Sequence, residues 1–114
     1  MNLSTRTEGN TLILAPQGRI DHAHADAFQK ALEPHLQACT ADGQAVLLDF
    51  AGIDYISSVG LRVLMLAARQ VKAQNGRIAI ARLTPVVREV FEISRFNLVF
   101  QVFDDLDTAL RNLA

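Results

Sequence analysis

The chain has 114 residues and a formal net charge of −1; half of its residues are apolar and 20% are charged. These totals are those of an ordinary globular protein with one hydrophobic core, and we expect a single domain that spans residues 1–114. The eleven Lys and Arg residues are scattered, which argues against a nucleic-acid-binding protein, because such proteins gather basic residues in a stripe or patch.

The first third of the chain predicts a β-hairpin followed by a helix. Residues 11–15 form an apolar run that ends at a proline and a turn-prone Gln-Gly pair, which is typical of a strand. A weaker strand at residues 3–7 is expected to pair with it across a turn at residues 8–10. In residues 25–39 apolar side chains recur at steps of three and four, which predicts a helix with one apolar face.

After residue 44 the pattern alternates between strands and helices, which predicts an α/β fold with a mixed sheet of four or five strands and four helices. The nearly uninterrupted apolar run at residues 45–50 is typical of a strand that is covered on both faces. Three further elements are expected up to residue 81: a loop at residues 51–57, a helix from about Ser58 to Gln74 and a strand at residues 77–81. Thr84 and Pro85 then open a helix whose apolar face carries Val86, Val90 and Phe91, with Ile93 as a further candidate. A strand at residues 98–103 and a last helix, capped by Asp104 and running through Leu113, complete the chain.

The segment DYISSVGLR at residues 54–62 brings two adjacent hydroxyls to the start of a helix. The first turn of a helix has free backbone N–H groups and a partial positive charge, so it favours an anion. Ser58 is therefore a good helix cap, and it is also a good site for a phosphate group. The local pattern leaves both interpretations open. Gly60 has a structural interpretation too, because a glycine permits close packing against a neighbouring element.

Four segments, in the right order, carry a resemblance that covers nearly the whole chain. They are GRID at residues 18–21, VLLDF at 46–50, YISSVGLRVL at 55–64 and ARLTPVVREVF at 81–91. On these residues the chain resembles the STAS domains, and in particular the bacterial anti-sigma factor antagonists. The resemblance implies the STAS fold and a protein that binds other proteins and has neither catalytic activity nor a cofactor.

The resemblance also implies a mechanism. In this family the unphosphorylated protein binds an anti-sigma factor that is also a serine kinase of the GHKL type, and the sigma factor is released. Phosphorylation of the serine two residues before the motif glycine, here Ser58, breaks that complex, and a PP2C-type phosphatase restores binding. Sporulation-type members usually have an aspartate immediately before the acceptor, where this chain has Ser57. Ser57 is thus an alternative acceptor, or Asp54 supplies the negative charge nearby.

The helix that follows Ser58 has two apolar stripes. At about 100° per residue, Val59, Val63 and Leu66 lie nearly opposite the face that is expected to pack on the sheet. Either this second stripe packs on another helix, or part of it is an exposed patch for a partner. The residues assigned to a partner surface are Asp21, Asp54, Ser57, Ser58, Val59, Gly60, Arg62, Val63 and Leu66.

Two aspartates have competing interpretations. Asp21 is either a turn or cap residue for the first helix or part of the partner surface beside Ser58. Asp49, at the end of an apolar strand, stands where a receiver domain would accept phosphate, but the acidic pair and the late lysine that such domains need are missing.

The three histidines lack the spacing of a metal site, and the segment around Ser57 is not a G-x-S-x-G nucleophile motif.

The single cysteine, Cys39, excludes an internal disulfide and a cysteine metal site. The first residues lack the layout of a signal peptide, and no apolar run approaches the roughly 20 residues that span a bilayer, so we expect a cytoplasmic protein without membrane contact. Two functions remain: an anti-sigma factor antagonist switched at Ser58, or a STAS scaffold subunit of a transporter or sensory complex that is not phosphorylated.

Overall fold

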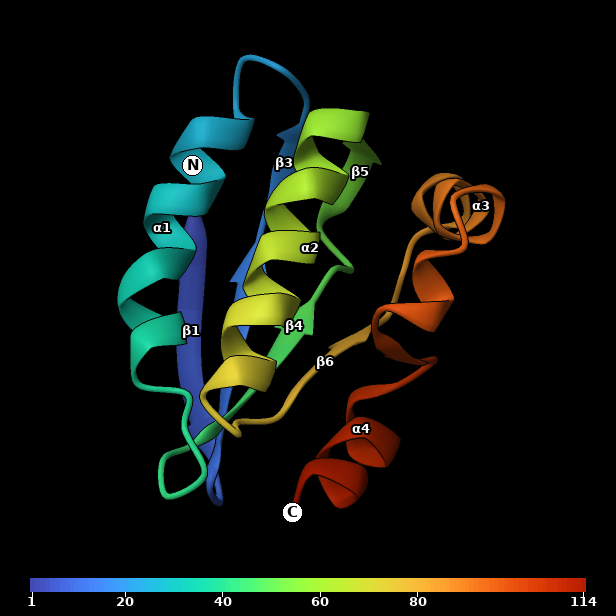
Figure 1. Cartoon of the computed structure of the whole chain (residues 1–114). Coiled ribbons are helices and arrows are strands. Elements are labelled where there is room, and N and C mark those ends of the chain that lie inside the picture. The colour runs from blue at the N-terminus through green and yellow to red at the C-terminus, as the bar shows by residue number, and fades with distance from the viewer.

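The computed structural model describes residues 1–114 and has an α/β fold with four α-helices (Figure 1). The predicted α/β fold with a mixed sheet is therefore confirmed. The elements in chain order are β1 (Leu3–Glu8), β2 (Thr11–Pro16), β3 (Gly18–Ile20), α1 (Ala25–Gln37), β4 (Ala45–Asp49), β5 (Ile53–Ile56), α2 (Ser58–Ala73), β6 (Ile78–Ala81), α3 (Pro85–Ile93), the short 3-10 helix η1 (Phe96–Leu98), β7 (Gln101–Phe103) and α4 (Leu106–Leu113).

The main sheet has five strands in the order β1-β2-β4-β6-β7. β1 and β2 form the predicted antiparallel hairpin, and β2, β4, β6 and β7 run parallel to one another. β4 lies at the centre, and all five of its residues are buried, as its apolar run predicts. The side chains of β4 alternate, so that Val46 and Leu48 join the core on one face and Ala45 and Leu47 join the core on the other.

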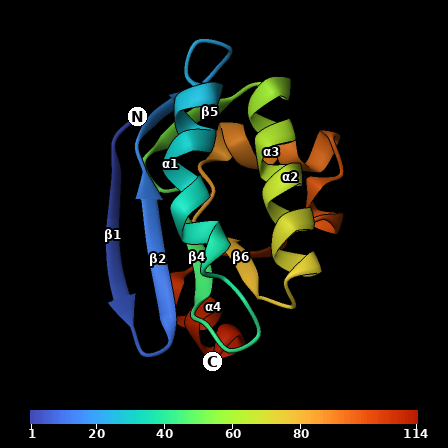
Figure 2. The ribbon, with the colours of Figure 1, turned by 60° about the vertical axis from the view of Figure 1, so that its left-hand side comes forward.

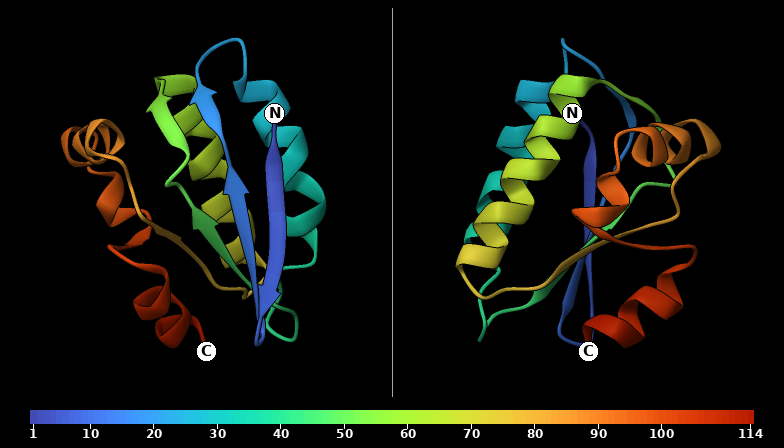
Figure 3. Two further views of the ribbon diagram at one scale, coloured as in Figure 1. Left: turned by 180° about the vertical axis from the view of Figure 1, so that it is seen from behind. Right: turned by 45° about the vertical axis from the view of Figure 1, so that its right-hand side comes forward.

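Helices cover both faces of this sheet. α1 and α2 lie side by side on one face, over a core that includes Phe28, Phe50 and Leu64 (Figure 2). α4 lies on the opposite face, as the view from behind shows (Figure 3), where its Ala109 packs against the small side chains Ala79 and Ala81. α1 and α2 both begin at the same end of the molecule, so their first turns are neighbours.

The structure contains a second sheet, of two strands, that was not predicted from the sequence. Residues 51–57 were expected to form a loop, yet Ile53–Ile56 form β5, which pairs in parallel with β3. The two end residues, Ile53 and Ile56, are buried, whereas Asp54 and Tyr55 between them are more exposed, so half of the side chains of β5 reach the core. This small sheet continues the main sheet toward the start of α2, and it holds the segment that contains Ser57 and Ser58.

The C-terminal third of the chain differs from the prediction in three places. Residues 98–103 form a strand only at Gln101–Phe103, because Phe96–Leu98 form the 3-10 helix η1. The cap of α4 is Asp105 and not Asp104: the Asp105 carboxylate accepts a hydrogen bond from the Thr108 backbone N–H at 2.7 Å. Val86 and Ile93 do not belong to the buried face of α3, since they are 52% and 77% exposed, and the side chain that α3 buries beside Phe91 is Val87. Among the helices of the chain, none combines the length and the apolar character that a membrane crossing requires.

Candidate functional site

The start of α2 is held in place by Ser57, which is the cap of the helix. The sequence placed the cap at Ser58, one residue too late. The Ser57 side-chain oxygen accepts a hydrogen bond from the Gly60 N–H at 3.2 Å, and its hydroxyl donates to the Ile20 carbonyl at 3.1 Å. The Ser57 backbone N–H donates to the same carbonyl at 2.9 Å. Ser57 is only 7% exposed, so its hydroxyl is both covered and fully bonded.

Ser58 has the opposite environment. It is the first residue of α2, its side chain is exposed, and its hydroxyl makes no hydrogen bond within the chain. The backbone N–H groups of Ser58 and Val59 also have no partner in the chain, whereas the next two are bonded to Ser57. A free hydroxyl thus lies beside two free N–H groups at the positive end of a 16-residue helix. This arrangement can accept a phosphate without any change of fold.

Gly60 is required by packing. A Cβ atom at this position would lie 2.7 Å from the Ile20 side chain, 2.8 Å from the Ile20 carbonyl oxygen and 2.8 Å from the Ile56 side chain. The first turn of α2 therefore approaches the ends of β3 and β5 more closely than any other residue would allow. The structural interpretation of Gly60 is correct, and its contacts fix the position of Ser58 at the surface.

Asp21 is a turn residue at the start of α1. Its carboxylate accepts hydrogen bonds from the His24 backbone N–H at 3.1 Å and from the His24 ring Nδ1 at 2.6 Å, and the Arg19 guanidinium lies 3.6 Å away. The side-chain hydrogen bond with His24 lowers the pKa of Asp21 below its ordinary value. Asp21 is also the residue after Ile20, whose carbonyl accepts a hydrogen bond from the Ser57 hydroxyl. Asp21 is therefore one residue away from the residue that holds the cap of α2.

The second stripe of α2 meets α1 in a groove of about 270 Å³, which we call the α1–α2 groove. Val63 is buried between the two helices, as the packing alternative for this stripe predicted. Leu66 is 40% exposed and Val59 is partly exposed, so the rest of the stripe remains at the surface. The lining residues are His22, Ala25, Asp26 and Gln29 from the α1 side and Val59, Arg62, Val63 and Leu66 from α2.

The α1 side of this groove was not predicted from the sequence. The helical spacing of residues 25–39 identifies its buried face, but the pairing of α1 with α2 comes from the order of the strands beneath them.

Asp54 lies outside the groove, on the exposed side of β5. Its neighbour Tyr55 stacks under the Arg19 guanidinium, whose central carbon is 4.7 Å from the ring centre. No sequence pattern indicates this pair, because the two residues are far apart in the chain.

Asp49, the residue behind the receiver-domain interpretation, has a structural role. Its carboxylate receives two hydrogen bonds from the Arg82 guanidinium, at 3.0 and 2.6 Å, and one from the Ala51 N–H at 3.2 Å. Arg82 has a left-handed backbone, with φ of 61°, at the end of β6. This ion pair connects the residue that follows β6 to the last residue of β4. Within the chain, no three His, Cys, Asp or Glu side chains are close enough to hold a metal ion.

Comparison with known proteins identifies the family. Residues 2–109 match the model of the STAS domain. The chain is 39% identical, over 96% of its length and 91% of the relative, to a protein of Bordetella bronchiseptica named "Putative anti-sigma factor antagonist BtrV".

Two solved structures have the same fold. An anti-sigma factor antagonist from Mycobacterium paratuberculosis superposes with a TM-score of 0.84 at 20% identity, covering 98% of this chain and 92% of that one. The Bacillus cell fate determinant SpoIIAA, in its phosphorylated form, superposes with a TM-score of 0.70 at 15% identity, covering 99% of this chain and 100% of that one. The fold, the family model and the relative agree, and the chain belongs to the STAS domain family, in which its relatives include anti-sigma factor antagonists.

Proposed function

We propose that this protein is an anti-sigma factor antagonist that binds an anti-sigma factor and loses that binding when Ser58 is phosphorylated. The observation that carries the proposal is the contrast between the two serines at the start of α2. Ser58 is exposed and unbonded, and it lies next to two free backbone N–H groups, whereas Ser57 is buried and bonded to Ile20 and Gly60. A kinase can reach the first hydroxyl and not the second.

The contacts of Ser57 argue against it as the acceptor. Transfer of phosphate to Ser57 requires its hydroxyl to leave the Ile20 carbonyl and its oxygen to leave the Gly60 N–H. The bulky dianion would then have to fit where only 7% of the residue is exposed. Phosphorylation at Ser57 would therefore open the first turn of α2, while phosphorylation at Ser58 leaves that turn intact.

The α1–α2 groove is the proposed binding surface for the partner. It begins one residue after Ser58, and it combines the partly exposed Val59 and the exposed Leu66 with the charged Arg62. A phosphate on Ser58 adds a charge of about −1.5 to −2 at the edge of this surface, so a bound partner would have to desolvate that charge or move away from it. The switch thus changes the surface rather than the fold.

The partners follow from the same proposal. The anti-sigma factor is a serine kinase of the GHKL type that phosphorylates Ser58, and a PP2C-type phosphatase removes the phosphate. The relative named as an anti-sigma factor antagonist supports the binding role. A protein of the same fold that has been solved in a phosphorylated form supports the regulation. Asp21, which follows β3, and Asp54, on the exposed side of β5, are proposed to border the surface.

The proposal is tested by binding of the cognate anti-sigma factor kinase to three variants. Ser58→Ala should bind as the parent protein does but should not be phosphorylated. Ser58→Asp should bind more weakly, and Ser94→Asp, which adds the same charge at an exposed serine after α3, should bind normally. Equal binding by Ser58→Asp and the parent would contradict the switch and would fit the scaffold function instead.

A further inference from the structure

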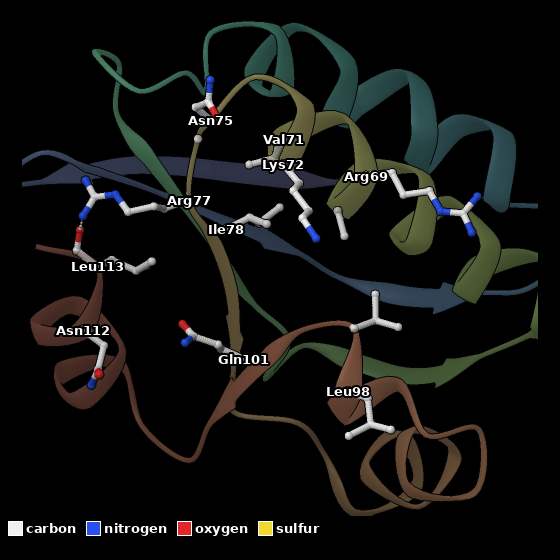
Figure 4. Close-up of a pocket in the computed structure, with 13 residues that line it drawn as sticks. Arg69, Val71, Lys72, Asn75, Arg77, Ile78, Leu98, Gln101, Asn112 and Leu113 are labelled. Atoms are coloured by element: carbon white, nitrogen blue, oxygen red, sulfur yellow. Dashed lines mark hydrogen bonds between the residues drawn. The ribbon is translucent and has the colours of Figure 1, made fainter.

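A second hollow lies at the far end of α2. It has a volume of about 730 Å³ and opens between the last turns of α2, the first residues of β6 and β7, η1 and the end of α4 (Figure 4). Lys72 lies about 20 Å from Ser58 along the helix axis, at 1.5 Å per residue. This hollow, which we call the basic cleft, is therefore separate from the α1–α2 groove at the start of the same helix, and the two share no lining residue.

The charges that line the basic cleft all have one sign. Arg69, Lys72 and Arg77 border it, no Asp or Glu does, and none of the three takes part in an ion pair. Figure 4 shows Lys72 projecting from α2 into the opening, toward the side that carries Gln101 and Leu98. Arg77 donates a hydrogen bond to the Leu113 carbonyl, which holds its guanidinium at the rim. In a chain with a net charge of −1, this is an uncompensated positive surface.

Apolar side chains lie on the opposite wall of the cleft. Leu98 is 77% exposed and Val99 is 42% exposed, and they belong to the few large apolar side chains that this chain leaves open to solvent. Exposed apolar side chains that are rimmed by polar or charged residues mark a surface that a partner can cover. A suitable partner carries both negative charge and apolar side chains.

The arrangement does not suit a small anion or a nucleic acid. Arg69 and Lys72 lie one helical turn apart, and the Arg69 side chain points away along α2, so the cations are spread along the cleft and do not converge on one point. Gly76 is explained by packing, since a Cβ there would lie 2.4 Å from the Cys39 carbonyl oxygen, and it does not form a phosphate loop. No aromatic side chain lines the cleft, so bases have no surface on which to stack.

We propose that the basic cleft binds an acidic peptide segment of a partner protein. Carboxylates of the segment pair with Arg69, Lys72 and Arg77, and an apolar side chain between them covers Leu98 and Val99. The assignment goes beyond the switch at Ser58, because it adds a second binding surface that the phosphate does not reach. A partner held here remains bound in both phosphorylation states.

The probe for this proposal is a short fluorescent peptide in which glutamate alternates with leucine. Its binding is followed by fluorescence anisotropy and by backbone amide chemical shifts. The double reversal Arg69→Glu with Lys72→Glu should weaken binding roughly tenfold or more, and added salt should weaken binding to the parent protein. A matched control, Arg6→Glu with Lys30→Glu, makes the same change in net charge at exposed side chains outside the cleft and the α1–α2 groove, and should bind normally.

Two further variants separate the apolar contact from the switch. Leu98→Ser should weaken binding of the peptide, whereas Ile93→Ser, at an equally exposed side chain (77% in both), should not. Ser58→Asp should bind the peptide as the parent does, which keeps this test independent of the proposed function. Absence of saturable binding, equal loss in the control pair, or saturable binding of inorganic phosphate to the same amides would each overturn the proposal.

Discussion

The two ends of α2 differ in packing: the first turn is closely packed and hydrogen-bonded, whereas the last turns carry exposed side chains. At its first turn, Ser57 is hydrogen-bonded to Ile20 and Gly60, and Gly60 packs so closely against Ile20 that a Cβ atom would not fit. The Ser58 hydroxyl beside them makes no hydrogen bond within the chain. At its last turns, exposed side chains surround an open cleft, and Arg69 and Lys72 have no ionic partner.

The difference between the two ends is consistent with the two roles that we propose for this helix. Where the backbone beneath a residue is closely packed and fully hydrogen-bonded, as it is at Ser57 and Gly60, a phosphate on the exposed neighbour is expected to change mainly the surface. Where side chains are exposed and flexible, binding depends on charge and is sensitive to salt. The rigid end suits a switch, and the open end suits a contact that persists.

The largest effect is expected from Gly60→Ala. Alanine is the better helix former by about 1 kcal/mol, so helix propensity alone predicts a more stable protein. The new methyl group, however, would lie 2.8 Å from the Ile20 carbonyl oxygen. Overpacking of this kind should lower the free energy of unfolding by about 2 kcal/mol or more. Urea denaturation measures the change, and a variant as stable as the parent would show that the first turn is not rigid.

Ser57→Ala should have the next largest effect. It removes the cap of α2 and leaves the buried Gly60 N–H without its partner, so we expect a loss of about 1–2 kcal/mol in the free energy of unfolding. Ser58→Ala is the matched control one residue away. Its side chain is exposed and unbonded, and its effect should stay within about 0.5 kcal/mol. Equal losses in the two variants would refute the assignment of the cap to Ser57.

Ser58→Asp should slightly stabilise the fold. A negative charge in the first turn interacts favourably with the free N–H groups and the helix dipole, by about 0.3–1 kcal/mol at low salt. The gain should shrink when salt is added, because the site is exposed. Thermal unfolding at two salt concentrations measures it. Destabilisation by this substitution would mean that charge at Ser58 opens α2, contrary to a switch that acts at the surface.

The smallest effect concerns pH. The hydrogen bond from His24 lowers the pKa of Asp21, so the contribution of this carboxylate to stability is fully present above its ordinary pKa and is lost as the pH falls through the lowered value. Carboxyl carbon NMR should show Asp21 titrating below its usual range. His24→Ala should return the titration toward that range. A parent Asp21 that titrates at its ordinary pKa would show that the contact with His24 does not hold in solution.

Much of the fold could be predicted from local patterns. The buried run of β4, the hairpin β1–β2 and the amphipathic faces of α1 and α2 follow from the spacing of apolar residues, and each is confirmed. β5 was missed because its four residues are buried at the two ends and more exposed in the middle, so they lack the alternation by which a strand is recognised. Helix caps were misplaced by one residue at both Ser57 and Asp105, because two adjacent residues of the same type give the same local signal.

The site was predicted less completely than the fold. The segment with Ser57, Ser58 and Gly60 was identified from the sequence, but which serine is buried depends on the contact with Ile20, 37 residues away. The partner of Asp49 was not foreseen for the same reason, since Arg82 follows another strand, β6, and is 33 residues away. The basic cleft has no counterpart in any sequence motif. It arises where the ends of α2, η1 and α4 meet in space.

The central claim is that Ser58, and not Ser57, receives the phosphate. The most direct test is to incubate the purified protein with its anti-sigma factor kinase and ATP and to map the modified residue by mass spectrometry of the peptide that contains both serines. We expect a single phosphate on Ser58 in the parent protein and in Ser57→Ala, and none in Ser58→Ala. Phosphate on Ser57, on another residue, or on none would contradict the claim.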